Sequence, residues 1–249
     1  MKKLMLSLCL LPLLAAGAKA DPFEDFKADL LAKSLTEAEA LLKPFAMDLG
    51  GVIGGNDFNS GRSLGFPGFE AGLAFTVQAK PSVENRLLRD AGVNAFGVPV
   101  LHAGAALPLI GADVMARATG YSGFTIMGAG LRKSVLKSGT VTKFIPDVSV
   151  SAWYDIVTYD YFKGSHLSFD ATASFDIPVI KPYVGVGIDR TTLEIKNVNA
   201  ALNGVDATIS KPRYTVGVRL SPLPLLYIYG AYNILHGQAG YSVGAGAKF

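Results

Sequence analysis

The chain of 249 residues contains one cysteine, Cys9, near its N-terminus. Cys9 lies in the apolar run 4–16, which two lysines precede and the small residues Ala18-Lys19-Ala20 follow. This order is typical of a secretory signal peptide, and we predict that residues 1–20 are removed by cleavage after Ala20. The mature chain would then hold no thiol. Disulfides, thiolate catalysis and cysteine metal sites are therefore excluded from it.

Charge is also scarce, since 17% of the residues are charged and 50% are hydrophobic, with a mean hydropathy of +0.33. The net charge of +3 belongs to the leader. Removing its three lysines takes the 23 basic side chains to 20, equal to the 20 acidic ones. A neutral mature chain gives no reason to expect a nucleic-acid partner.

After the leader, the sequence lacks any run of 18 apolar residues, which argues against a helical membrane span. From residue 67 onward, apolar side chains recur instead at every second position, in segments long enough for a tilted strand to cross a bilayer. We predict ten strands, over residues 68–79, 97–107, 111–120, 124–136, 147–158, 165–176, 182–194, 207–220, 225–235 and 239–249.

The alternation gives each predicted strand one apolar face and one small, polar or charged face. Apolar faces in lipid require a closed sheet, because an open edge would leave backbone groups unpaired. We therefore predict an all-β fold for residues 67–249, a transmembrane antiparallel up-and-down β-barrel of about ten strands. Turns rich in proline follow the even-numbered strands, and we assign them and the C-terminus to the periplasmic side. An exported soluble β-sandwich is the alternative, but its outer face should be richer in Lys, Glu and Thr.

The C-terminal strand carries a resemblance to a known group of proteins. Its apolar row resembles the strand that bacterial outer-membrane barrels present to their assembly machinery, and consists of Tyr241, Val243, Ala245, Ala247 and Phe249. The resemblance implies that the bacterial outer membrane is the location, and that its lipid and the barrel assembly machinery are partners.

The order of segments before the barrel carries a second, looser resemblance. A short helix, the glycine-rich stretch 49–55 and the start of a strand at Gly68-Phe69-Glu70 resemble a family of uncharacterised outer-membrane barrels. The layout is also distantly similar to FadL-type channels for hydrophobic compounds, in which an N-terminal segment plugs the lumen. We transfer no ligand-site residue from those channels.

Residues 21–66 are predicted to form an N-terminal helix and a glycine-rich plug or tether. Asp21 can cap a helix over residues 22–43, and Pro44 is expected to end it. Its apolar stripe must be buried, so we predict that it forms a plug or periplasmic lid through Phe26, Leu30, Leu31, Leu35 and Leu42. Packing on the outside of the barrel or on the membrane surface is the alternative.

If the apolar strand faces contact lipid, the opposite faces line the lumen. Both signs of charge then meet in a narrow space, where ion pairs across the lumen are the first explanation and a selectivity lining is the alternative. The predicted lumen-lining residues are Glu70, Asp113, Arg117, Asp147, Trp153, Asp155, His166, Asp170, Arg213 and Arg219.

The sequence holds three histidines and no nucleophile-elbow motif or metal-ligand spacing. We therefore predict no catalytic residue, no metal and no cofactor. The predicted function is a monomeric, small, plugged or gated channel for apolar or small solutes, with a small apolar ligand as a partner. The alternatives are a structural or surface-interaction barrel without transport, such as an adhesin or an envelope anchor, and a membrane-embedded hydrolase.

Overall fold

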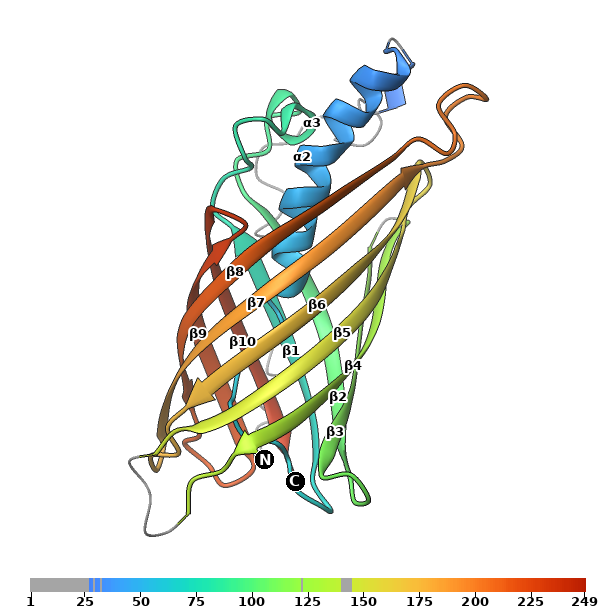
Figure 1. Cartoon of the computed structure of the whole chain (residues 1–249). Coiled ribbons are helices and arrows are strands. Elements are labelled where there is room, and N and C mark those ends of the chain that lie inside the picture. The colour runs from blue at the N-terminus through green and yellow to red at the C-terminus, as the bar shows by residue number, and fades with distance from the viewer. Residues whose placement is uncertain (1–26, 29, 32, 122, 140–144) are drawn as a thin grey trace, which may run out of the picture.

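The computed structural model describes all residues except 1–26, 29, 32, 122 and 140–144, so the predicted leader lies outside the described residues. Ten antiparallel strands form a closed barrel in chain order, with β1 paired to β10 (Figure 1). This confirms the predicted up-and-down barrel of ten strands. The strands are β1 (Phe69–Gln78), β2 (Phe96–Leu107), β3 (Ala112–Tyr121), β4 (Phe124–Leu136), β5 (Asp147–Thr158), β6 (Phe162–Ser174), β7 (Ile180–Ile195), β8 (Asp206–Leu220), β9 (Leu226–Leu235) and β10 (Gln238–Lys248).

Burial alternates along each strand as the sequence pattern requires. Thr76 and Ser168 face the interior and are fully buried, whereas Leu101 points outward and is 63% exposed. Large apolar side chains cover the outside of several consecutive strands. The C-terminal row from Tyr241 to Phe249 belongs to this outer surface. The outer wall is therefore apolar, and the polar side chains gather inside.

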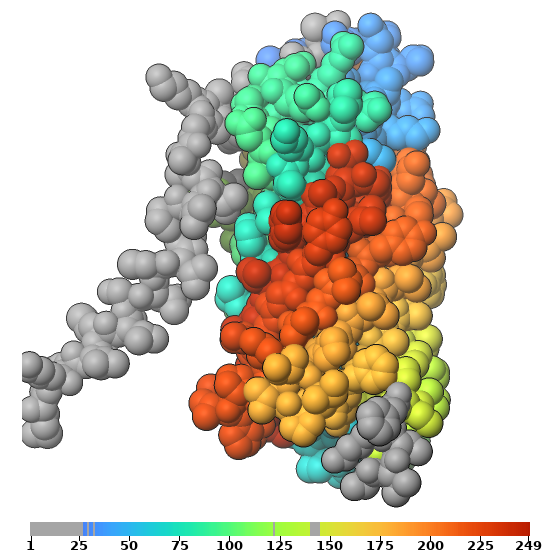
Figure 2. All heavy atoms as spheres, turned by 90° about the vertical axis from the view of Figure 1, so that its left-hand side faces the viewer, coloured from blue at the N-terminus to red at the C-terminus, as the bar shows by residue number. Residues whose placement is uncertain are grey.

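The helix α2 (Leu35–Gly54) sits in one mouth of the barrel, where it packs mainly on β7 and β8. Figure 2 shows α2 and the connection between β1 and β2, which holds the short helix α3 (Arg86–Asp90), together at one end of an elongated molecule. Among the described residues, no helix has the length and hydropathy of a membrane span.

The predicted helix over residues 22–43 is confirmed only in part: residues 27, 28, 30 and 31 are helical, residues 33 and 34 are not, and α2 continues past residue 43. The helix begins after Ser34, whose backbone N–H and hydroxyl both donate to the Glu37 carboxylate, at 2.9 and 2.7 Å. These hydrogen bonds hold the pKa of Glu37 below its ordinary value. Ser34 and Glu37 have the spacing of a capping box, so this start was readable from the sequence.

Pro44 lies inside α2 and does not end it, which contradicts the prediction. A proline in a helix interior costs about 3 kcal/mol. After Pro44, however, the helix buries Phe45, Leu49 and Ile53 almost completely. Each such side chain contributes about 1.5 to 3 kcal/mol when it leaves water, so burial in the barrel mouth outweighs the local penalty.

The plug enters from the end opposite to the C-terminus, where α2 contacts the β1–β2 and β9–β10 connections (Figure 1). The C-terminal side is the one assigned to the periplasm. The prediction of a periplasmic lid is therefore wrong. Leu30 and Leu42 are fully buried, but Leu31 and Leu35 are 50% and 54% exposed. They are not part of the buried stripe, and Phe26 lies outside the described residues.

The glycines at the end of α2 allow the helix to touch the barrel wall. A Cβ on Gly54 would lie 2.6 Å from Arg213 Nε and 2.8 Å from an Asp189 oxygen. A Cβ on Gly50 would lie 3.0 Å from the Cβ of Thr191. Because these positions are helical, the interpretation of this stretch as a flexible tether is also wrong.

The close approach at Gly54 makes a prediction about stability. We expect Gly54→Ala to lower the free energy of unfolding by about 1 to 3 kcal/mol, because the added methyl overpacks a filled interior. Gly230→Ala is the matched control, since a Cβ there meets nothing nearer than 4.0 Å. Urea unfolding, followed through the fluorescence of the single tryptophan, compares the two. Equal midpoints would contradict the tight contact.

Candidate functional site in the barrel interior

The interior has three levels along the barrel axis. Around α2, apolar wall residues such as Phe162 and Leu193 form a collar against Leu42 and Phe45. Below it, the chain leaves α2 at Gly55 and passes through the lumen to β1 at the other end. We call residues 55–64 the threading segment. Its polar contacts define the two lower levels.

Asp48 anchors the helix within the collar. Its buried carboxylate accepts hydrogen bonds from Gln78 Nε2, the Ser82 backbone N–H and Asn85 Nδ2, at 2.8, 2.9 and 2.7 Å. These donors come from β1 and from the connection that follows it. The carboxylate therefore joins α2 to the loop that covers the same mouth.

At the middle level, the Asp57 carboxylate of the threading segment bridges two guanidinium groups of the wall. One oxygen binds Arg117 of β3, and the other accepts from Arg213 of β8 at 2.9 Å. All three side chains are 0 to 1% exposed. We call this bridge the Asp57 latch, because it holds the threading segment to opposite parts of the barrel.

Other carboxylates of the wall complete the surroundings of both arginines. Arg117 forms a two-pronged bond with Asp155 at 2.6 and 2.7 Å. Arg213 donates to Asp189 at 3.0 Å and to Asp170 at 2.9 Å. Two-pronged and charge-assisted bonds of this kind fix orientation as well as charge. The arginines are thus oriented to receive Asp57.

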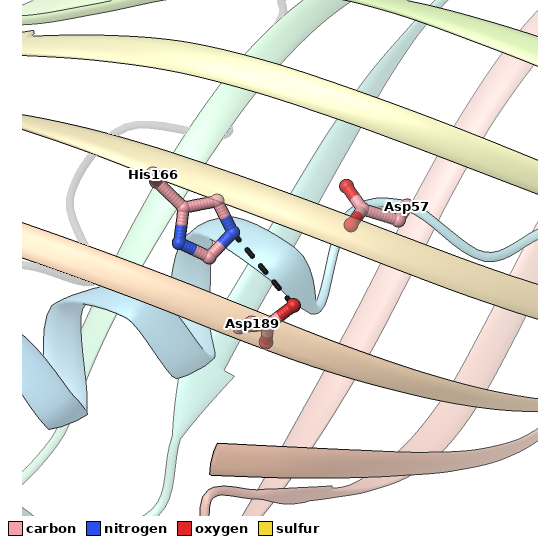
Figure 3. Close-up of side chains that lie close together, drawn as sticks. All are labelled: Asp57, His166 and Asp189. Atoms are coloured by element: carbon pink, nitrogen blue, oxygen red, sulfur yellow. Dashed lines mark ion pairs between the residues drawn. The ribbon is translucent and has the colours of Figure 1, made fainter. Parts of the chain in front are cut away.

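Two histidines border the latch. His236 Nε2 lies 2.8 Å from an Asp189 oxygen, and its Nδ1 lies 2.7 Å from the carbonyl oxygen of Met47 in α2. His166 Nδ1 contacts the Thr191 hydroxyl at 2.9 Å, while its Nε2 has no hydrogen-bond partner and lies 3.9 Å from Asp189 (Figure 3). His236 therefore ties Asp189 to the helix, whereas His166 lies beside Asp189 without a hydrogen bond to it.

Asp57, His166 and Asp189 offer ligand atoms within 4.8 Å of one another, a spacing that could hold a metal ion. Both carboxylates also accept from Arg213. The guanidinium groups supply positive charge where a metal cation would sit. The arrangement is therefore better suited to an ionic latch than to a metal centre.

A second ionic group lies nearer the C-terminal end. Arg132 of β4 pairs with Asp113 at 3.0 Å and with Glu70 at 3.2 Å. Asp113 also accepts the backbone N–H of Leu64, and the Ser63 N–H donates to the Ser134 hydroxyl at 2.7 Å. The backbone of the threading segment is thus bonded to β3 and β4.

Two cavities adjoin the threading segment. One of about 20 Å³ lies beside Asp57, between His102 and Trp153. The other, of about 240 Å³, lies at the C-terminal end beside Arg62 and Lys181. Partial burial opposes ionisation of Asp176 in the larger cavity, but the Lys181 ammonium outweighs it and holds the pKa of this carboxyl below its ordinary value.

The structure places all ten predicted lumen residues in the interior. Six of them, including Trp153 against the Arg117 guanidinium, surround or contact the latch and its neighbours, whereas four lie toward the C-terminal end. The first set is Arg117, Trp153, Asp155, His166, Asp170 and Arg213; the second is Glu70, Asp113, Asp147 and Arg219.

Four residues of the site were missed by the sequence analysis. Asp189 and Arg132 share their inward face with Tyr183 and with Ser134, so strand alternation could have found both. Asp57 follows α2 in a segment without periodicity, and His236 lies in a turn. No sequence signal marked these last two.

A serine hydrolase would need a serine hydroxyl within hydrogen-bond reach of an imidazole. Within the described part of the chain, His166 contacts a threonine, His102 contacts the Tyr227 hydroxyl at 3.0 Å, and His236 contacts Asp189 and a backbone oxygen. The hydrogen bonds of these three rings therefore assemble no serine and histidine pair.

Comparison with known proteins gives only distant likenesses. No family model and no curated protein matches the chain. Among solved structures, the N-terminal barrel domain of Pseudomonas aeruginosa OprF is 15% identical, with a TM-score of 0.36, over 73% of this chain and 97% of that one. Yersinia pestis Ail is 12% identical with a TM-score of 0.33 over 73% and 97%, and Acinetobacter baumannii Omp33 is 10% identical with a TM-score of 0.31 over 76% and 99%. These likenesses are too weak to assign a function.

The latch predicts a stability difference between a buried and an exposed ion pair. We expect Asp57→Ala to destabilise the protein by about 1 to 3 kcal/mol, because buried guanidinium N–H groups of Arg117 and Arg213 lose an acceptor while their other carboxylates remain. Glu194→Gln removes the exposed pair with Lys163, at 3.1 Å, and should cost no more than about 1 kcal/mol. Urea unfolding measures both variants. A similar small cost for each would show that the latch is not a strong constraint.

Proposed function

We propose that the protein spans the bacterial outer membrane as a closed channel whose lumen is occupied by its own N-terminal segment. The membrane location is supported by the apolar outer wall of a barrel that leaves no open strand edge. We also propose that the outward row ending at Phe249 is the signal read by the barrel assembly machinery.

The observation that carries the channel proposal is the Asp57 latch. It places the closure in a segment that is separate from the wall, and fixes it there by side-chain contacts. The attraction within a buried ion pair is largely offset by the cost of removing both charges from water. If the threading segment left and water entered, the exposed arginines and aspartates would regain their hydration. Such an interface favours a displaceable plug.

The solute class follows from the groups that displacement would expose. The wall would present Arg117, Arg213 and Asp155 to the pore, together with the hydroxyl and carboxylate groups around them. Charged groups such as these do not bind apolar molecules, because they would lose water without gaining partners. We therefore propose small hydrophilic solutes, which narrows the predicted class of apolar or small solutes.

A surface-interaction role without transport is the second candidate. The filled lumen favours it, since the latch residues are almost inaccessible to solvent. On this proposal, the covered mouth with α2 and α3 would contact partners. The two candidates differ in whether the plug ever opens a path for ions.

Single-channel recording in planar bilayers tests the channel. The wild-type protein should be almost silent, and Asp57→Ala should open about tenfold more often, because a cost of about 1 to 3 kcal/mol corresponds to roughly one to two factors of ten. Glu194→Gln is the charge-matched control outside the plug and should remain silent.

A disulfide between α2 and β7 distinguishes openings caused by movement of the plug from openings caused by a damaged barrel wall. Gly50→Cys and Thr191→Cys place two Cβ atoms about 3.0 Å apart, which a disulfide would need to widen slightly. In the Asp57→Ala background, the oxidised disulfide should suppress the openings and reduction should restore them. Openings that persist in the oxidised protein, or their absence from Asp57→Ala itself, would argue against a displaceable plug.

A further inference from the structure

The larger cavity lies at the end of the barrel opposite to α2, between the threading segment and the wall. Its lining carries four cationic side chains, Arg62, Lys181, Arg219 and Lys248, and two carboxylates, Asp147 and Asp176. The side chains of Arg62, Lys181 and Asp176 are each about one-third exposed, at 39%, 33% and 33%, so the cavity reaches solvent. A solute could therefore enter without movement of the plug.

The two carboxylates are already engaged by two of the cations. Asp176 binds Arg62 at 2.6 Å and also binds Lys181. Asp147 lies 3.6 Å from Arg62 and accepts the backbone N–H of Ser138 at 2.6 Å. These groups neutralise one another across the rim of the cavity.

Arg219 and Lys248 make no ion pair within 4.0 Å in the described part of the chain. Arg219 is 6% exposed, donates to Asn59 at 3.3 Å and stacks 3.6 Å from the centre of the Tyr227 ring. Glu70, opposite Lys248 in the β1–β10 register, forms its ion pair with Arg132. The lining carries four cations against two carboxylates, and Glu70, which shares Arg132 with Asp113, adds negative charge beside Lys248, so that about one net positive charge remains.

We propose that this cavity binds a phosphate dianion, either as free phosphate or a small phosphomonoester, or as the headgroup of a phospholipid. A lining with more cations than carboxylates suits an anionic group. Donors that converge from the threading segment, β7, β8 and β10 suit an acceptor with oxygens in several directions. Leu225 and Leu226 form an apolar side of the cavity that can accept a hydrocarbon group attached to the phosphate.

Isothermal titration of the purified protein in detergent, with inorganic phosphate and with phenyl phosphate, tests the site. Saturable binding of one anion per barrel is expected. Lys248→Gln should weaken the binding at least about tenfold, since it removes a charged hydrogen-bond donor. Lys181→Gln is a second variant on another strand, and should also weaken it. Lys163→Gln, at the other end of the barrel and away from the cavity, is the control and should leave the affinity unchanged.

The source of the phosphate is resolved by repeating the titration in phosphatidylcholine nanodiscs with and without phosphatidic acid. Loss of phosphate binding when phosphatidic acid is present would assign the cavity to a lipid headgroup. Unchanged binding would assign it to a free anion. The proposal is overturned if neither phosphate nor phosphatidic acid distinguishes Lys248→Gln from Lys163→Gln.

The site does not depend on the plug being displaceable. Oxidised protein with the Gly50→Cys and Thr191→Cys disulfide should bind phosphate as the wild type does, because the cavity lies at the opposite end. The anion-site proposal and the channel proposal can therefore be refuted independently of each other.

Discussion

A ten-stranded barrel encloses more space than inward side chains from its own wall readily fill, and this constraint governs the rest of the structure. The chain fills the space with a second layer, made of α2 and the threading segment. Because the layer lies against charged wall residues, it must supply polar partners as well as volume. Asp57 does so by joining Arg117 to Arg213 across the lumen. Filling of the lumen and bridging of the two wall arginines are therefore achieved by the same segment.

The barrel was predictable from the sequence because the alternation of apolar and polar side chains is present within each strand. Lipid outside and polar groups inside impose an alternation that ten successive segments repeat, and even Asp189 and Arg132 obey it. The latch was not predictable in the same way. Arg117 and Arg213 lie 60 and 156 residues from Asp57 along the chain. Only closure of the barrel brings them together, and no periodicity marks the residue that they share.

The helix shows the opposite relation between local and tertiary effects. Pro44 is a local stop signal, but the mouth of the barrel buries the apolar residues that follow it in α2, except for the half-buried Met47. The glycines after them are equally ambiguous in sequence, since they fit a tether or a close contact. The wall decides between these, because Thr191 and Arg213 leave no space for a side chain at Gly50 or Gly54. The start of α2 after Ser34 depends on a local capping box, and it could therefore be read from the sequence.

The collar and the latch have different consequences for movement of the plug. Withdrawing α2 would expose Leu42, Phe45 and Leu49 to water, at about 1.5 to 3 kcal/mol for each side chain. Breaking the latch exposes groups that water can solvate again. The apolar collar therefore keeps the barrel closed at rest, and the ionic latch fixes the threading segment without making its release prohibitive. An opening mechanism must offer α2 another apolar surface, such as a partner protein or the membrane interface, because the solvated pore cannot replace the contacts that the collar provides.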